Sequence, residues 1–253
     1  MKSICLLLGF ALSFNTFSQT APKARASRAL SIDIAYSVHL PAGDVGKRFG
    51  YNNGIGGGFR YKTEKNLVVG ICGNFMFGSH TKERTILEAI STAEGDIINS
   101  NGQLIQPRLF ERGANYFVQC GKLVPLYKND KNSGLLLMGG IGWLQHKQRI
   151  EVPGEGANQL FPEYKRGYDN LHGGLALNQT IAWQFMEPKK QLLNFYIGLE
   201  MMQGFTKNLR GYNYATRLPD TAKKHDYFFG LKLCWMIPRY FGFKDKNEEY
   251  FYK

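Results

Sequence analysis

The sequence predicts an all-β fold, an eight-stranded antiparallel up-and-down transmembrane β-barrel with long extracellular loops. Three observations predict it. Apolar residues alternate with polar or small ones in eight segments, most segments run to about eleven residues or more, and short and long connections alternate between them. Such alternation turns one face of a strand toward an apolar medium, and tilted strands of roughly 9–11 residues cross a bilayer.

The first segment, 29–40, shows the alternation most clearly. Every even-numbered position from Leu30 to Leu40 is apolar, and the odd-numbered positions carry small or polar residues, with Asp33 among them. In a membrane barrel the apolar face contacts lipid and the other face points into the lumen. This arrangement accounts for a carboxylate in the middle of an otherwise apolar strand.

The remaining segments repeat the pattern with regular connections. A secreted β-sandwich is the alternative, but its strands average about five or six residues, and a sheet exposed to lipid has to close. An even number of strands places both termini and the short turns on one side of the membrane, and with a signal peptide at the front of the chain we expect that side to be periplasmic. The further strands are 54–62, 66–78, 113–125, 134–147, 171–185, 192–205 and 226–238; the short turns are 63–66, 126–134 and 186–191; the outer loops are 41–53, 79–112, 148–170 and 206–225.

The N-terminal end of the chain indicates export. Residues 1–18 have a basic start at Lys2, an apolar core and small residues before a possible cut, as in a secretory signal peptide. A buried N-terminal helix is the alternative. We expect a periplasmic lead at 19–28, the barrel at 29–238 and a periplasmic, aromatic-rich tail at 239–253.

The inward positions predict a filled lumen. An eight-stranded barrel is only wide enough for side chains to fill it, and buried charges require partners. We therefore expect Asp33 and Glu200 to neutralise Arg60 and Lys232. A catalytic interpretation of the two carboxylates is the alternative to this salt-bridge network. The predicted polar network of the lumen comprises Asp33, Arg60, Asn74, Asn115, Asn178, Glu200 and Lys232.

Aromatic residues near the strand ends predict girdles at the two membrane interfaces, where tyrosine and tryptophan concentrate in membrane barrels. The girdle residues are Tyr36, Tyr61, Phe77, Trp143, Trp183, Phe185, Tyr227 and Trp235.

Other features weigh against several classes of site. The net charge of +12 is spread over loops and ends, and an exported chain rarely meets nucleic acid, so no nucleic-acid partner is expected. The stretch GIGGG (54–58) precedes a strand rather than a helix, which excludes a phosphate loop. Cys72, Cys120 and Cys234 do not form a metal motif or a disulfide framework, although a Cys72–Cys120 or Cys120–Cys234 bridge stays open.

Two sets of residues in or near the loops raise functional alternatives. His80, His146 and His172 lie near the outer ends of strands, where a Ser/His/acid hydrolase acting on lipid A would need them, but no motif supplies the acid. Tyr164 and Asp169 in the loop 161–171 suit a cation or a glycan, or packing of the loop base.

The loop 79–112 is expected to contain a short amphipathic helix capped by Ser79 or Thr81, followed by a hairpin turning at Asn101-Gly102. Long structured loops often carry function.

The stretches GIGWLQHK, EYKRGYDNL, LNFYIGLEMMQGFT and DYFFGLKLCWMIPRYF resemble a family of small outer-membrane barrels of Bacteroidota-type Gram-negative bacteria, in the OmpA-like and PorT-like grouping. Some members of the grouping are accessory parts of secretion and gliding machinery. The residues after the last strand do not resemble the peptidoglycan-binding domain of full-length OmpA proteins, so we do not expect a role in anchoring the cell wall.

These considerations together predict a non-enzymatic outer-membrane protein, an accessory or structural subunit of a secretion or assembly complex, with no catalytic site, cofactor or metal. Its expected partners are outer-membrane lipid and lipopolysaccharide, and another envelope protein bound through 79–112 or 239–253. A lipid A hydrolase and a narrow solute channel are the alternatives.

Overall fold

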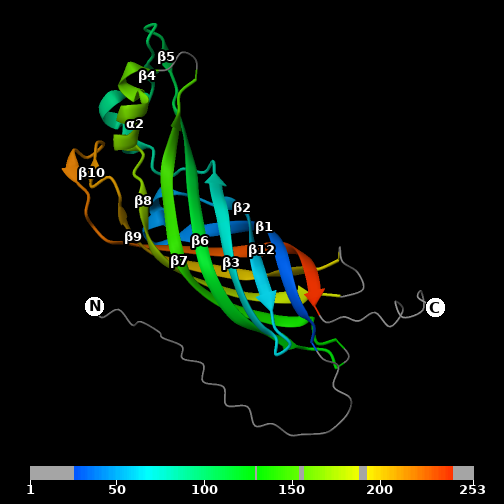
Figure 1. Cartoon of the computed structure of the whole chain (residues 1–253). Helices are drawn as coiled ribbons and strands as arrows, with labels where there is room; N and C mark the ends of the chain where they lie inside the picture. The colour runs from blue at the N-terminus through cyan, green and yellow to red at the C-terminus, as the bar shows by residue number, and fades with distance from the viewer. Residues whose placement is uncertain (1–25, 129, 154–156, 188–192, 242–253) are drawn as a thin grey trace.

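The fold is a closed barrel of eight antiparallel strands, as the sequence predicts (Figure 1). The computed structural model describes residues 26–128, 130–153, 157–187 and 193–241, so the predicted signal peptide and most of the predicted tail lie outside the described residues. Around the barrel the order is β1-β12-β9-β8-β7-β6-β3-β2. The strands are β1 (Arg28–Ala42), β2 (Asn52–Lys62), β3 (Leu67–Gly78), β6 (Arg108–Pro125), β7 (Gly134–Glu151), β8 (His172–Phe185), β9 (Phe195–Asn208) and β12 (Lys224–Phe241).

The first and last strands close the barrel. Arg28 of β1 pairs with Phe241 of β12, and Ala42 pairs with Tyr227. The chain therefore enters and leaves the barrel at the same end. The long connections emerge at the opposite end.

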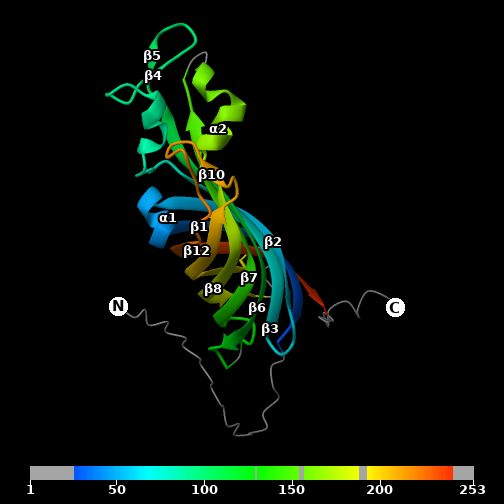
Figure 2. The same ribbon diagram turned by 90° about the vertical axis from the view of Figure 1, so that its left-hand side faces the viewer.

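Three of these long connections fold together into a structure that we call the head. The head consists of the segments 79–107, 152–153, 157–171 and 209–223, and it adjoins the ends of β6 and β7. The head lies beyond the end of the barrel that is opposite to the end where the chain enters and leaves (Figures 1 and 2). Its elements are η1 (Thr85–Ile90), β4 (Ile97–Ile98), β5 (Leu104–Ile105), η2 (Asn158–Leu160), α2 (Pro162–Tyr168), β10 (Tyr212–Asn213) and β11 (Leu218–Pro219).

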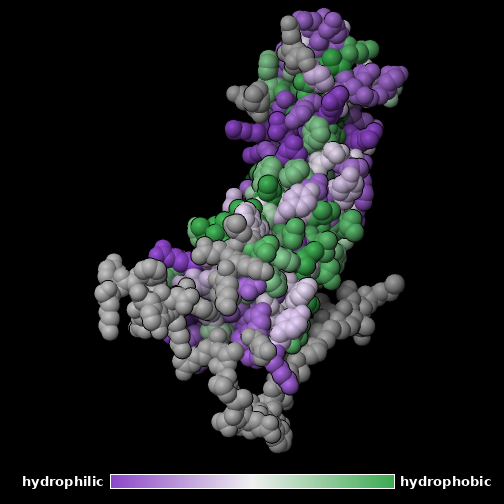
Figure 3. Space-filling view, turned by 90° about the vertical axis from the view of Figure 1, so that its right-hand side faces the viewer, coloured by the Kyte–Doolittle hydropathy of each residue, from purple (hydrophilic) through white to green (hydrophobic). Residues whose placement is uncertain are grey.

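The outer surface of the barrel is apolar. Ile32 is 50% exposed, whereas its neighbour Ser31, which faces inward, is 4% exposed. Figure 3 shows hydrophobic side chains gathered over the middle of the molecule, below a mostly hydrophilic head. None of the helices in the described residues has the length and hydrophobicity needed to cross a membrane. All eight predicted girdle residues lie on the outer face, where Tyr36, Tyr61, Trp143, Trp183 and Trp235 are exposed and Phe77, Phe185 and Tyr227 are half-buried.

Several strands are longer than predicted. β6 begins at Arg108 and β7 ends at Glu151, and these two residues pair. The prediction stopped earlier because charged residues interrupt the apolar pattern there, although backbone pairing continues. Strand β12 likewise runs through Pro238 to Phe241; its pairing with β9 ends at Trp235, so the proline lies where one side of the strand is free, as at a sheet edge.

The predicted loop 41–53 has a structure of its own. It contains α1 (Gly43–Arg48), which covers the mouth of the barrel at the end where the long connections emerge. Val45 and Phe49 are fully buried there, packed against apolar side chains that point inward from the strands. The loop therefore forms an apolar stopper at the mouth of the barrel nearest the head.

In the segment 79–107 one prediction is confirmed and one is wrong. The hairpin forms: Ile97 pairs with Ile105, and Gly102, with φ +79°, donates its N–H to the carbonyl of Asn99 at 3.1 Å. The helix is a 3₁₀ turn of six residues, with Arg84 at its N-cap position and no side-chain cap. Ser79 and Thr81 lie outside it, so neither caps it.

Candidate functional site

The inward faces of the strands bring polar side chains into one closed space, and inward glycines make room for them. A Cβ added at Gly54 would lie 2.5 Å from Ser37 Oγ, and one at Gly56 would collide with Asn74 Oδ1. The glycine-rich stretch thus serves packing across a narrow lumen.

One half of the predicted ionic network joins β1 and β2. Arg60 Nε donates to Asp33 Oδ2 at 2.8 Å, a second guanidinium nitrogen donates to the same oxygen, and Ser31 Oγ donates to Asp33 Oδ1. The guanidinium also lies 4.6 Å from the centroid of the Tyr196 ring. Arg60 is 6% exposed, so its charge is satisfied almost entirely by these protein groups.

The other half joins β9 and β12. Lys232 Nζ donates to Glu200 Oε1 at 2.7 Å, and Asn178 Nδ2 donates to the same oxygen at 2.9 Å. The second carboxylate oxygen lies 3.1 Å from His39 Nε2. Glu200 and Lys232 are 3% and 2% exposed, so neither has a compensating contact with bulk solvent.

Amide side chains connect the strands between these pairs. Asn74 Nδ2 donates to Asn115 Oδ1 at 2.9 Å, and Gln119 Nε2 donates to Asn178 Oδ1. The seven residues proposed for the lumen therefore divide into an Asp33–Arg60 pair, an Asn74–Asn115 pair and a group around Glu200.

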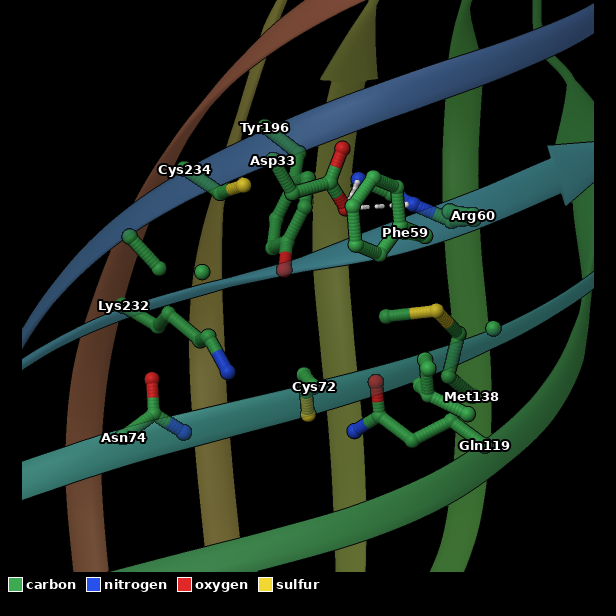
Figure 4. A pocket seen from close by; sticks show the side chains of 14 residues that line it. Asp33, Phe59, Arg60, Cys72, Asn74, Gln119, Met138, Tyr196, Lys232 and Cys234 are labelled. Carbon is green, nitrogen blue, oxygen red and sulfur yellow. Dashed lines mark hydrogen bonds and ion pairs between the residues drawn. The ribbon is translucent and has the colours of Figure 1, made fainter.

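Apolar clusters flank the polar network on both sides. One cluster, which includes Val68, Leu123 and Leu136, lies toward the end where the chain enters and leaves the barrel. The other, which includes Phe49 and Phe228, lies toward the head. Between them remains a cavity of about 20 Å³, roughly the room one water molecule needs. Figure 4 shows Asp33, Arg60, Tyr196 and Lys232 around this space.

At the mouth of the barrel nearest the head, Arg48 links α1 to two of the long connections. Its Nε donates to Glu83 Oε2 at 3.1 Å and a terminal nitrogen donates to the carbonyl of Asn170 at 3.0 Å. Burial lowers the pKa of Arg48, and the Glu83 carboxylate opposes part of that change. These contacts tie the stopper to two loops of the head.

The rim histidines do not form a hydrolase triad. His146 Nε2 lies 2.9 Å from Asp226 Oδ2, which also accepts a hydrogen bond from Thr206 Oγ1. His146 is 1% exposed, its Nδ1 has no partner, and its ring stacks on His172 at 5.7 Å. The buried pair thus lacks a nucleophile in hydrogen-bond contact with its free nitrogen.

The Ser79–His80 candidate is equally incomplete. Ser79 Oγ lies 3.4 Å from His80 Nδ1 on the exposed surface, and the His80 ring stacks on Tyr51 at 4.1 Å. Within the described residues His80 has no carboxylate partner to orient it.

The described residues also contain no group of three or more His, Cys, Asp or Glu side chains able to hold a metal ion. Asp169 instead accepts from Arg210 at 2.8 Å, and this hydrogen bond raises the pKa of the arginine. Cys72, Cys120 and Cys234 are free thiols; Cys120 is exposed on the outside and Cys234 is buried inside, so the disulfides left open by the sequence are not formed.

Two parts of this arrangement escaped the sequence analysis. The alternation drew attention to inward polar residues, but apolar residues such as Met76, Phe117 and Leu144 also point inward and form a buried cluster in the lumen. The pairing of His146 with Asp226, 80 residues apart, leaves no local pattern. The apolar Val45 and Phe49 in an otherwise polar loop were the available signal for the stopper.

The chain is similar to solved outer-membrane proteins at low identity. Ail, the attachment invasion locus protein of Yersinia pestis, matches with 12% identity over 83% of this chain and 99% of its own, at a TM-score of 0.39. Its complex with the heparin analogue sucrose octasulfate matches with 13% identity, 82% and 99% coverage and a TM-score of 0.33. Neisserial surface protein A matches with 8% identity, 82% and 97% coverage and a TM-score of 0.36.

No family model and no curated protein matches the sequence. At these values the similarities assign neither a family nor an activity to the chain.

Proposed function

We propose that this protein is a non-enzymatic barrel of the outer membrane of a Gram-negative bacterium, with periplasmic termini, and that it acts as an accessory or structural subunit of a secretion or assembly complex. The observation that carries the proposal is the inverted barrel: outward side chains are apolar and exposed, while charges such as Glu200 and Lys232 are buried inside. A bilayer is the medium that favours this inversion. The sequence resemblance to PorT-like barrels supports the accessory role.

The filled lumen argues against a channel. In the described part of the chain, two apolar clusters lie across the lumen, and the cavity between them has a volume of only about 20 Å³. We expect negligible conductance when the purified protein is inserted into planar bilayers. A stable, large conductance would mean that the lumen opens and that the channel alternative is correct.

The head offers the surface for a protein partner. Leu104, Phe161 and Leu218 lie on its separate connections, and their exposed fractions are 61%, 55% and 62%. The head also has its own apolar core, formed by Ile86, Ile97 and Leu160 among others. Exposed apolar side chains on a rigid, ordered support are typical of docking surfaces.

A gentle-detergent pull-down from outer membranes tests this role. We expect the wild-type protein, tagged after Lys253, to recover another envelope protein in a stoichiometric amount. The variant Leu104→Ser/Leu218→Ser should lose that protein, and the control Gln103→Ser, at an exposed polar position of the same hairpin, should keep it. Recovery of the barrel alone from all three would contradict an accessory role.

The His146–Asp226 pair is the observation that favours a lipid A hydrolase. Its burial and the absence of a bonded nucleophile weigh against that activity. We expect His146→Gln and His172→Gln to leave the lipid A mass profile of the cells unchanged. A shifted profile, with the variants still present in the outer membrane, would restore the hydrolase hypothesis.

A further inference from the structure

An apolar groove crosses the outer face of β2, β3, β6 and β7. It encloses about 620 Å³. Gly57 and Gly73 are partners on adjacent strands and form its floor, because neither carries a side chain. Its walls include Phe59, Ile71, Tyr116 and Trp143, whose exposed fractions are 42–58%.

Cationic side chains lie on the same outer face, between the groove and the head. Arg112 of β6 and Lys147 of β7 are direct cross-strand partners. Both point outward, since their neighbours Glu111 and His146 are buried inside. Like charges directly opposite each other destabilise a strand pair, so this pair favours an anion between the two side chains.

In the described part of the chain, acidic groups fill that place only in part. Asp169 accepts a hydrogen bond from Lys147 at 3.4 Å and a shorter one from Arg210 at 2.8 Å, and the Lys147 side chain is still 43% exposed. Glu151 is paired with Arg149 at 2.9 Å. Arg112 donates to the backbone carbonyl of Glu111 and lies over the Phe110 ring, and in the described part of the chain it has no ion pair.

The spacing of the cations and the groove fits one leaflet of a bilayer. Arg112 is four residues from Tyr116 on β6 (116 − 112 = 4), roughly 13 Å along the strand at about 3.3 Å per residue and about 10 Å along the membrane normal for a strand tilted by about 40°. Half of a hydrocarbon core of about 30 Å is about 15 Å. An anionic headgroup held by the cations thus has its acyl chain alongside the groove.

We propose that this face binds one phosphorylated, multiply acylated glycolipid of the outer leaflet, of the lipid A class. A phosphate lies between Arg112 and Lys147, where both donate charge-assisted hydrogen bonds to it, and an acyl chain fills the groove over Gly57 and Gly73. The inference rests on the membrane position proposed above and assigns the barrel a specific lipid.

Native mass spectrometry of the full-length barrel tests the assignment. The protein is inserted into phosphatidylcholine nanodiscs that contain a small fraction of bisphosphorylated lipid A, and the lipid retained after release is counted. We expect about one lipid A per wild-type barrel. Arg112→Gln/Lys147→Gln should retain it about tenfold or more weakly, because two charge-assisted contacts are lost. Dephosphorylated lipid A should be retained equally weakly by the wild type.

Two further comparisons separate the groove from general lipid binding. Ile71→Trp narrows the groove and should reduce retention, whereas Leu199→Trp, on the exposed face of β9 outside the groove, should not. Lys207→Gln/Lys223→Gln removes two exposed cations from the β9 and β12 side and is the charge control. The proposed site would be overturned if all variants retained lipid A equally well, or if the control variants lost as much lipid A as the site variants.

Failure of the site and failure of the membrane proposal give different results. A barrel that does not float with vesicles after a carbonate wash contradicts the membrane position and, with it, the lipid site. A barrel that inserts but shows no preference for bisphosphorylated lipid A contradicts the lipid site alone.

Discussion

The lumen and the head bury side chains of different character. In the lumen, ion pairs and amides such as Glu200–Lys232 and Asn74–Asn115 lie between apolar clusters, and exposed apolar residues cover the outside. In the head, Ile86, Ile97 and Leu160 form an apolar cluster, and only a few polar side chains such as Asn99 and Asp169 are buried as well. The difference reflects the medium around each region. The barrel has the apolar outer surface that lipid favours, whereas the head has apolar residues inside and polar residues outside, as a domain in water does.

The largest effect is expected when a lumen charge loses its partner. Lys232→Met leaves the Glu200 carboxylate buried without its cation, and we expect a loss of about 3–5 kcal/mol in the free energy of unfolding. Urea unfolding in lipid vesicles, followed by heat-modifiable gel mobility, measures it. Lys232→Met/Glu200→Gln should recover most of the loss, because no charge of that pair remains. A cost below about 1 kcal/mol for the single variant would show that this pair does not hold the lumen together.

In the head the corresponding test is a cavity. Ile97 is fully buried and the adjacent Ile98 is 49% exposed. Ile97→Ala should destabilise the head by about 2–4 kcal/mol, seen as faster proteolysis of the loop segments, with the gel mobility of the folded barrel unchanged. Ile98→Ala should cost less than about 0.5 kcal/mol. Equal protease sensitivity of the two variants would mean that the apolar cluster does not stabilise the head.

A smaller effect is expected at the hairpin turn of the head. Gly102 has φ +79°, where a Cβ costs about 1–2 kcal/mol, so Gly102→Ala should weaken protease protection of the β4–β5 hairpin by about that amount. Gly102→Asn should cost less, because asparagine tolerates this conformation. Gly139→Ala is the control, since open space surrounds its Cβ position and its φ is not positive. If alanine and asparagine at position 102 behave alike, the backbone conformation is not what limits the hairpin.

The barrel was predictable because its signal is periodic. Strand alternation shows which residues share a face even when their partners on neighbouring strands are unknown. The inward direction of Asp33 and Glu200 and the outward direction of Trp143 could therefore be predicted from their positions alone. An eight-stranded barrel then left little freedom for the inward charges, because its lumen has to be filled.

The pairs and the head were harder to predict because they depend on register and on loop packing. Asp226 meets His146 only once β12, β9, β8 and β7 are in place. The charged ends of β6 and β7 extend as strands because Arg108 and Glu151 pair through their backbones, a property that hydrophobicity does not encode. The stopper at Phe49 depends on the space that the lumen leaves for it.

The smallest effect is expected at the ion pair between Arg210 and Asp169 in the head. The Arg210 side chain is 31% exposed, and solvent screens such a pair, so Arg210→Gln should cost about 0.5–1 kcal/mol. Added salt should reduce that cost, since exposed charges are screened over about 10 Å at 0.1 M. The cost of Lys232→Met should change little with salt, because both partners in the lumen are at most 3% exposed. Measuring both variants at low and high salt therefore distinguishes a lumen sealed from water from a solvated head, and equal salt dependence would contradict a sealed lumen.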